Sequence, residues 1–259
     1  MVRSADQGTM QRTETSSLPP HPTLSRYYGN DSARQRFVSG LFDSTASHYE
    51  FVEKILSFGS GAWYRRKAME DAGLKKGMRV LDLATGTGGV ARGAESIVGP
   101  SGTVVGLDAS LGMLREWRGL SSSRRIQGLG DRLPVREGSF DFITVGYALR
   151  HFGDLQATFA ELFRILRPQG TLLILEITPP RRGIAHQMLR LYMKHLIPFV
   201  TRVATRSQDV GTLMKYYWDT TDTCLAPAGI LSALERAGFQ RAERKVTFGI
   251  FSDYVARRL

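Results

Sequence analysis

The sequence predicts an α/β fold built on a doubly wound, mostly parallel sheet with helices on both faces, and three features of residues 80–108 indicate it. The apolar run at residues 80–83 has the length and composition of a buried strand. A turn with Gly86 and Gly88 follows it, as where a strand leads into a helix. A second apolar strand at residues 103–108 ends in Asp108. This arrangement holds a nucleoside at the carboxyl edge of such a sheet, so we expect a nucleoside-bearing cofactor.

The acid in the first strand, Asp82, distinguishes between two cofactor classes. Gly86 and Gly88, with Ala91 three residues further on, fit a loose dinucleotide fingerprint in which a helix N-terminus binds pyrophosphate. A carboxylate at position 82 repels pyrophosphate, but it accepts hydrogen bonds, directly or through water, from the ammonium group of an amino acid. The sequence therefore favours S-adenosylmethionine, with Asp108 accepting from the ribose hydroxyls. In the structural alternative, Asp82 is only a helix N-cap and Asp108 is a solvated turn residue.

Later segments continue the alternation of strands and helices. Residues 139–145 are expected to form a buried central strand, and residues 155–166 have apolar side chains at helical spacing. The Arg-Pro-Gln-Gly sequence at 167–170 is expected to end this helix, and residues 171–176 supply another buried strand.

Composition bounds the size and location of the protein. Its 259 residues, 42% of them hydrophobic, suffice for one α/β domain with a full core. Residues 1–38, rich in Ser, Thr, Pro and Arg, are expected to be a flexible N-terminal extension. The single cysteine, Cys224, excludes an internal disulfide, and no metal-ligand spacing occurs. Because the chain lacks an 18-residue apolar run and a signal-peptide core, we expect a cytoplasmic protein.

Residues 177–208 form a basic amphipathic segment. The chain has a formal net charge of +11, and this segment contains six Lys and Arg residues and no acid. Apolar residues lie among them, and Pro198 interrupts the pattern. Such a segment can make a peripheral contact with the inner face of a membrane, or it can be an insertion that covers the active site with its arginines solvated. Nucleic acid is not an expected partner, because the segment has no recognisable binding module or aromatic stacking platform.

Ordered motifs across residues 41–259 resemble the class I methyltransferases of the ubiquinone/menaquinone C-methyltransferase (UbiE) family. The motifs are Phe42-Asp43-x5-Tyr49, Leu56-Ser57-Phe58-Gly59-x3-Trp63-x-Arg65-Arg66, the glycine motif after Asp82, Asp108-x-Ser110-x2-Met113-Leu114, Leu133-Pro134, Ala148-Leu149-Arg150 and Ala237-Gly238-Phe239. The resemblance implies that residues 39–259 form a methyltransferase domain, with a seven-stranded Rossmann-like sheet and a helical lid. It also implies S-adenosylmethionine-dependent C-methylation of a quinol or related phenolic ring, as in quinone biosynthesis. The oligomeric state stays open, with a homodimer as one option.

The resemblance assigns a role to each matching position. The residues expected at the cofactor are Asp82, Gly86, Thr87, Gly88, Asp108, Ala109, Met113, Leu129, Gly130, Asp131 and Gly146. In the family an Arg-Asn pair after the fourth strand lies beside the reacting ring, and this pair corresponds to Arg150 and His151. Arg150 would stabilise a phenolate or orient a water, and His151 would act as the base. In the alternative, Arg150 pairs with a structural carboxylate and His151 is a surface loop residue.

Four aromatic residues are expected at the methyl acceptor. Tyr49, Phe58 and Trp63 would form a lid over the ring, with Tyr147 beside them, unless they belong to the core.

The chain also departs from the family pattern on the acceptor side. Glu53 and Lys54 replace an Asn-Asp pair of the lid helix, Gly61 replaces a histidine, and His151 replaces the Asn of the pair described above. These changes leave two alternatives open. One is a methyltransferase for a specialised aromatic or polyketide metabolite, acting at oxygen or carbon, and the other is a non-catalytic S-adenosylmethionine-binding partner.

Two departures concern the cofactor. Gly89 stands where an acid often follows the second motif glycine, and Leu129 stands where a polar residue usually contacts the adenine amino group. Either Asp131 takes over that contact after a local shift, or backbone and packing hold the adenine.

Overall fold

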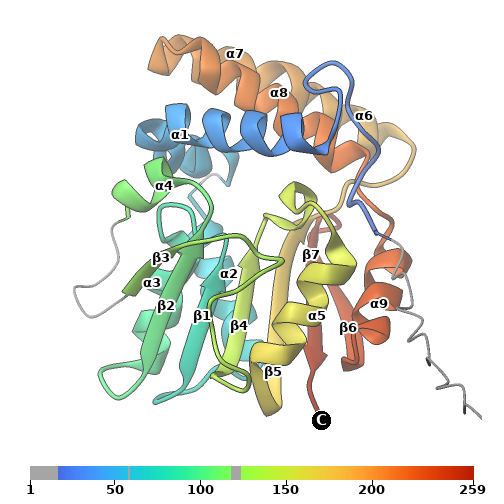
Figure 1. Ribbon diagram of the computed structural model, residues 1–259. Coiled ribbons are helices and arrows are strands. Elements are labelled where there is room, and N and C mark those ends of the chain that lie inside the picture. Colours follow the sequence, from blue (N-terminus) through green and yellow to red (C-terminus); the bar gives the residue numbers. More distant parts are fainter. Residues whose placement is uncertain (1–16, 58, 118–123) are drawn as a thin grey trace, which may run out of the picture.

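Seven strands form one twisted sheet in the computed structural model, which describes residues 17–57, 59–117 and 124–259 (Figure 1). The strand order is β3-β2-β1-β4-β5-β7-β6, parallel from β3 to β5, with β7 antiparallel to both of its neighbours. The bounds are β1 Arg79–Leu83, β2 Thr103–Asp108, β3 Arg124–Gln127, β4 Phe140–Gly146, β5 Leu166–Ile177, β6 Gln240–Thr247 and β7 Phe251–Arg257. The structure thus confirms the doubly wound, mostly parallel fold.

The helices of the described residues cover both faces of the sheet and its carboxyl edge (Figure 1). Their bounds are α1 Asp31–Leu56, α2 Gly61–Asp71, α3 Gly89–Val98, α4 Leu111–Arg115, η1 Leu149–His151, α5 Leu155–Ile165, α6 Ile184–Leu191, η2 Tyr192–Leu196, α7 Ile197–Thr205, α8 Gln208–Asp222 and α9 Pro227–Arg236. Apolar side chains of α2 and α3 pack on one face, and those of α5 and α9 pack on the other. A separate cluster joins α1, η2, α7 and α8 over the carboxyl edge, where parallel sheets bind ligands.

The connection between α5 and β5 differs in detail from the expectation. The Asp154 carboxylate caps α5 by accepting from the amides of Gln156 and Ala157. The helix ends at Ile165, two residues short of the one that precedes Pro168. Proline disfavours the helical conformation of the residue before it. Residues 166–170 therefore already belong to β5, with a register shift opposite β4.

Of residues 1–38, expected to be a flexible extension, residues 1–16 lie outside the described residues, and residues 27–38 pack onto the fold. Tyr28 is buried, and Tyr27 and Phe37 pack against the ring of Tyr216 on α8. The helix α1 begins at Asp31, where the Asn30 side chain accepts from an amide of the first turn. The aromatic residues thus anchor residues 27–38 to the helical cluster over the carboxyl edge, although their sequence lacks apolar periodicity.

The basic segment forms α6, a π-helical turn and α7 over the carboxyl edge of the sheet (Figure 1). Pro198 lies in the first turn of α7, which follows the π-helical turn without a break; because proline has no N–H, it donates no helical hydrogen bond there. Among the described residues, no helix is long and apolar enough to span a bilayer.

Candidate active site

The glycine turn and Asp108 form the floor of the site. Gly86 has a φ of +57°, with no heavy atom near the position of a Cβ, so the residue is glycine for its backbone conformation. Gly88 has a φ of +86°, and a Cβ there would meet the Trp117 ring at 2.9 Å. Asp108 accepts from the amide of Gly86 at 2.8 Å and from that of Ser110 at 2.8 Å. Its carboxylate is therefore fixed beside the turn.

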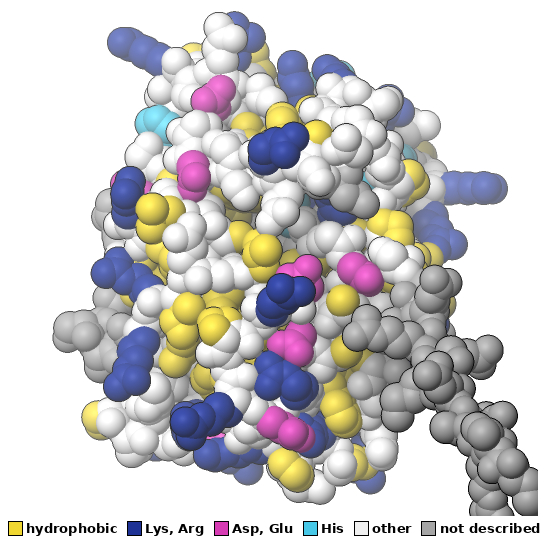
Figure 2. All heavy atoms as spheres, in the orientation of Figure 1, with side chains coloured by type: hydrophobic (Ala, Val, Ile, Leu, Met, Phe, Trp, Pro, Cys, Tyr) yellow, Lys and Arg dark blue, Asp and Glu magenta, His cyan; other side chains and the backbone are white. Residues whose placement is uncertain are grey.

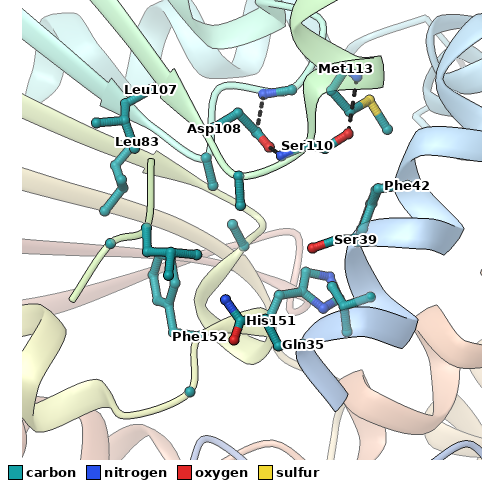
Figure 3. Close-up of a pocket in the computed structure, with 18 of the residues that line it drawn as sticks. Gln35, Ser39, Phe42, Leu83, Leu107, Asp108, Ser110, Met113, His151 and Phe152 are labelled. Atoms are coloured by element: carbon teal, nitrogen blue, oxygen red, sulfur yellow. Dashed lines mark hydrogen bonds between the residues drawn. The ribbon is translucent and has the colours of Figure 1, made fainter. Parts of the chain in front are cut away.

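A first cavity of about 370 Å³ opens between Asp108 and His151 (Figure 3). Its wall combines the ends of β1, β2 and β4 with residues of α1 and the segment after β3. Eight of the expected cofactor residues line it, namely Gly86, Asp108, Ala109, Met113, Leu129, Gly130, Asp131 and Gly146. Burial raises the pKa of Asp108, and the hydrogen bonds from Ser110 and Gly86 oppose that effect. A nucleoside with ribose hydroxyls that donate to a carboxylate fits this cavity.

Asp82 was expected to receive an ammonium group. It lines neither the first cavity nor the neighbouring cavity beneath the basic segment. Its side chain is fully buried and accepts from the hydroxyls of Thr85 at 2.6 Å and Thr144 at 2.7 Å. Burial raises the pKa of Asp82 to about 6. The carboxylate therefore ties the glycine turn to β4 from below. Gly88 likewise lines neither cavity, whereas Thr87 lines a second one.

This second cavity, of about 120 Å³, lies beneath the basic segment. Its wall is mostly apolar and aromatic, with contributions from α1, α2, α6, η2, α8 and β7, including Val52, Leu56, Tyr64, Leu189, Met193, Met214, Tyr217 and Phe251. It meets the first cavity at Tyr49, Ala84, Gly86, Gly146 and Tyr147, which line both. The expected acceptor residues Tyr49 and Tyr147 thus stand at the junction.

One of the expected lid residues, Trp63, is not found there. Trp63 is 59% exposed and lines neither cavity, because α2 turns its Gly61, Tyr64 and Arg65 face inward and leaves Trp63 outside. Phe58 lies outside the described residues.

Arg150 forms a buried ion pair, as the alternative of a structural carboxylate partner predicts. Its side chain is 1% exposed, and its Nη1 donates to Glu176 Oε1 at 2.6 Å. The guanidinium also lies 3.8 Å from the ring centroid of Tyr217. Burial raises the pKa of Glu176, an effect that the adjacent guanidinium opposes. Arg150 lines neither cavity, so the alternative of a structural carboxylate partner describes it.

His151 faces the first cavity opposite Asp108 (Figure 3). Its ring stacks on Tyr216 at 5.6 Å and meets Phe42 edge-on at 5.1 Å. Nδ1 is buried and has no hydrogen-bond partner among the described residues. Burial, reinforced by the charge of Arg150, holds the pKa of His151 well below its ordinary value. The imidazole is therefore neutral at physiological pH and has a lone pair available.

An ion pair inside the second cavity was not anticipated from the sequence. Arg65 on α2 donates to Glu53 on α1, and both side chains line the cavity. Arg65 occurs in one of the family motifs and Glu53 among the departures, but their contact depends on how α1 and α2 meet in the fold.

The sequence profile of the ubiE/COQ5 methyltransferase family matches residues 30–258. The chain belongs to this family. A demethylmenaquinone methyltransferase of Thermus thermophilus is 32% identical over 224 residues, which are 84% of this chain and 100% of that protein. A demethylmenaquinone methyltransferase of Lactococcus lactis is 35% identical over 187 residues, covering 70% of this chain and 72% of that protein.

Solved structures agree in fold. A SAM-dependent methyltransferase from Aquifex aeolicus has a TM-score of 0.56 at 18% identity, over 75% of this chain and 89% of that one. Family membership makes this protein an S-adenosylmethionine-dependent methyltransferase. The first cavity fits the cofactor's nucleoside, since it combines a fixed carboxylate with the glycine turn.

Proposed function

We propose that the protein transfers a methyl group to a ring carbon of a quinol or related phenolic acceptor. The observation that carries this proposal is the apolar, aromatic second cavity, which joins the nucleoside cavity at Tyr49 and Tyr147. Such a wall suits a flat hydrophobic ring. The names of the two bacterial relatives, which are demethylmenaquinone methyltransferases, support the same class of acceptor.

Methylation at carbon requires an electron-rich ring. Bound S-adenosylmethionine would supply a methyl group on a positively charged sulfur and leave as S-adenosylhomocysteine, and the methylated ring carbon then loses its hydrogen as a proton to restore the aromatic ring. A phenolic ring carbon becomes a good nucleophile when a ring hydroxyl loses its proton. In our proposal the ring hydroxyl reaches through the junction into the first cavity, where His151, neutral and with an unpartnered Nδ1, accepts its proton. Tyr49 and Tyr147 position the ring at the junction, where geometry supplies much of the rate.

This mechanism predicts that transfer depends on the redox state of the acceptor. An oxidised quinone has no hydroxyl to deprotonate, and its ring carbons are electron-poor. Methyl transfer to a demethylated naphthoquinone should therefore require a reductant, which a radiolabel assay with and without dithionite would measure. Equal transfer to the oxidised ring would rule out the proposed chemistry.

A peripheral membrane contact would bring a lipid-linked acceptor to the site. The outer face of α6, η2 and α7 exposes large apolar side chains, which are Ile184, Met188, Leu191, Leu196, Phe199, Val200 and Val203. Exposed arginines accompany them, namely Arg181, Arg182, Arg190, Arg202 and Arg206. The inner side of the same elements contributes Leu189, Tyr192 and Met193 to the second cavity. An anionic bilayer matches both the charge and the apolar character of this outer face.

Liposome binding tests this contact. Basic side chains are prominent on the face of the molecule in Figure 2, so the control must separate local from general attraction. Cosedimentation with anionic vesicles should weaken by about 30-fold or more in the R190E/R202E variant, because each of the two basic residues contributes about 1 kcal/mol near the surface and glutamate adds repulsion. K75E/K76E makes the same charge change before β1, away from the patch, and should bind like the wild type. Equal losses of vesicle binding in both variants would show a general charge attraction, and the segment would then only cover the active site.

A further inference from the structure

The ion pair between Glu53 and Arg65 stands out in a cavity that is otherwise mostly apolar. The Arg65 side chain is 8% exposed and that of Glu53 is 27% exposed. Arg65 uses Nη1 toward Glu53, while its Nε is buried and has no hydrogen-bond partner among the described residues. This donor is available to a ligand that enters the second cavity, which Arg65 lines, whereas the unpartnered Nε of Arg150 lies outside both cavities.

The pair lies directly over the glycine turn. A Cβ on Gly89 would lie 3.3 Å from Glu53 Oε2 and 3.6 Å from Arg65 Nη2. Gly89 is the first residue of α3, and Thr85, Gly86, Thr87 and Gly89 all line the second cavity. The two charged groups therefore face the turn and the N-terminus of α3, which favours a negative charge.

The position of Asp108 fixes the direction in which the cofactor extends. Asp108 lines the first cavity and not the second, whereas Gly86 lines both. A ligand whose ribose lies at Asp108 continues past Gly86 into the end of the second cavity at the glycine turn, which leaves the apolar end beneath α6 and η2 for the acceptor ring. Asp82, which the sequence suggested for the ammonium group, is buried beneath the turn with its oxygens bonded to two hydroxyls.

We propose that Arg65 binds the carboxylate of the cofactor's amino-acid end and that Glu53 binds its ammonium group. A zwitterion needs both charges compensated, because an unpaired buried charge is strongly unfavourable. The ion pair supplies one group of each sign. Each partner retains capacity for the ligand, since a guanidinium has five donors and a carboxylate has about four acceptor positions.

Two adenosine ligands that differ only at this end provide the test. S-Adenosylhomocysteine has the amino-acid group, and 5′-methylthioadenosine lacks it. In calorimetry, Glu53→Gln and Arg65→Gln should each weaken S-adenosylhomocysteine binding by about 10- to 100-fold, the range for charge-assisted hydrogen bonds. Both variants should bind 5′-methylthioadenosine within about 2-fold of the wild type, because the nucleoside contacts are untouched. Retained binding of this second ligand also shows that the variant is folded.

Two matched variants complete the design. Glu50→Gln removes a carboxylate one turn away on α1, which pairs with Arg92 at 2.9 Å and lines neither cavity, so it should leave both affinities unchanged. Asp108→Ala should weaken both ligands alike. Wild-type affinity of the Glu53 and Arg65 variants for S-adenosylhomocysteine, or equal loss of both ligands, would overturn the proposal. Neither ligand involves the acceptor, so the outcome is independent of the proposed quinol chemistry.

Discussion

Replacing His151 with Ala should lower turnover by about 10²- to 10⁴-fold, the usual contribution of a general base, while cofactor affinity stays within about 2-fold. The reason is that Nδ1 of His151 is a buried, neutral and unpartnered base in the first cavity. Single-turnover kinetics and calorimetry measure the two quantities separately. His195→Ala, at an exposed position of η2, is the matched control and should keep full activity toward a short-chain acceptor.

The pH dependence of this step follows from the direction of the pKa shift. Because the pKa of His151 lies well below 6.5, the imidazole stays neutral as the pH falls from 8 to 6.5, and its contribution to turnover should not change. The unfolded chain binds a proton at that histidine near pH 6.5. Its contribution to folding stability is therefore complete above that pH and decreases as the pH falls further.

A loss of cofactor affinity in the His151→Ala variant, in parallel with its loss of turnover, would instead make His151 part of the cofactor-binding wall.

Arg150→Met should lower the free energy of unfolding by about 3–5 kcal/mol, because it leaves the charge of Glu176 buried without a partner. Denaturant unfolding measures this loss. The double variant R150M/E176L replaces both charges with apolar side chains and should recover most of the stability. If Arg150→Met unfolds like the wild type but loses turnover, then Arg150 acts in catalysis after all.

The fold was predictable because its signals are local. The apolar run of β1, the glycine turn and the acid at the end of β2 each lie within a few neighbouring residues. The packing of residues 27–38 was not predictable in this way. Their order depends on contacts between Tyr27, Phe37 and Tyr216, which lies on a helix far along the chain.

The site residues also differ in whether local sequence signals or distant contacts determine their roles. Asp108 was identifiable because the end of a parallel strand places its side chain at the ligand-binding edge. Arg150 and Asp82 make contacts whose partners the sequence did not predict, because these contacts depend on residues from other strands, Glu176 in β5 and Thr144 in β4. The contact of Glu53 with Arg65 similarly requires the packing of α1 against α2. A motif identifies a position in the fold, but the groups that contact its side chain decide what that side chain does.

The position of the transferred methyl group tests the proposed C-methylation most directly. The protein would be incubated with S-adenosylmethionine labelled with a trideuterated methyl group and a reduced, demethylated naphthoquinol, and the product would be analysed by fragmentation mass spectrometry and NMR. The proposal predicts that the label is bound to a ring carbon and that the product oxidises to the methylated quinone. A label on a ring oxygen, or no transfer to the quinol alongside transfer to a different aromatic acceptor, would contradict it.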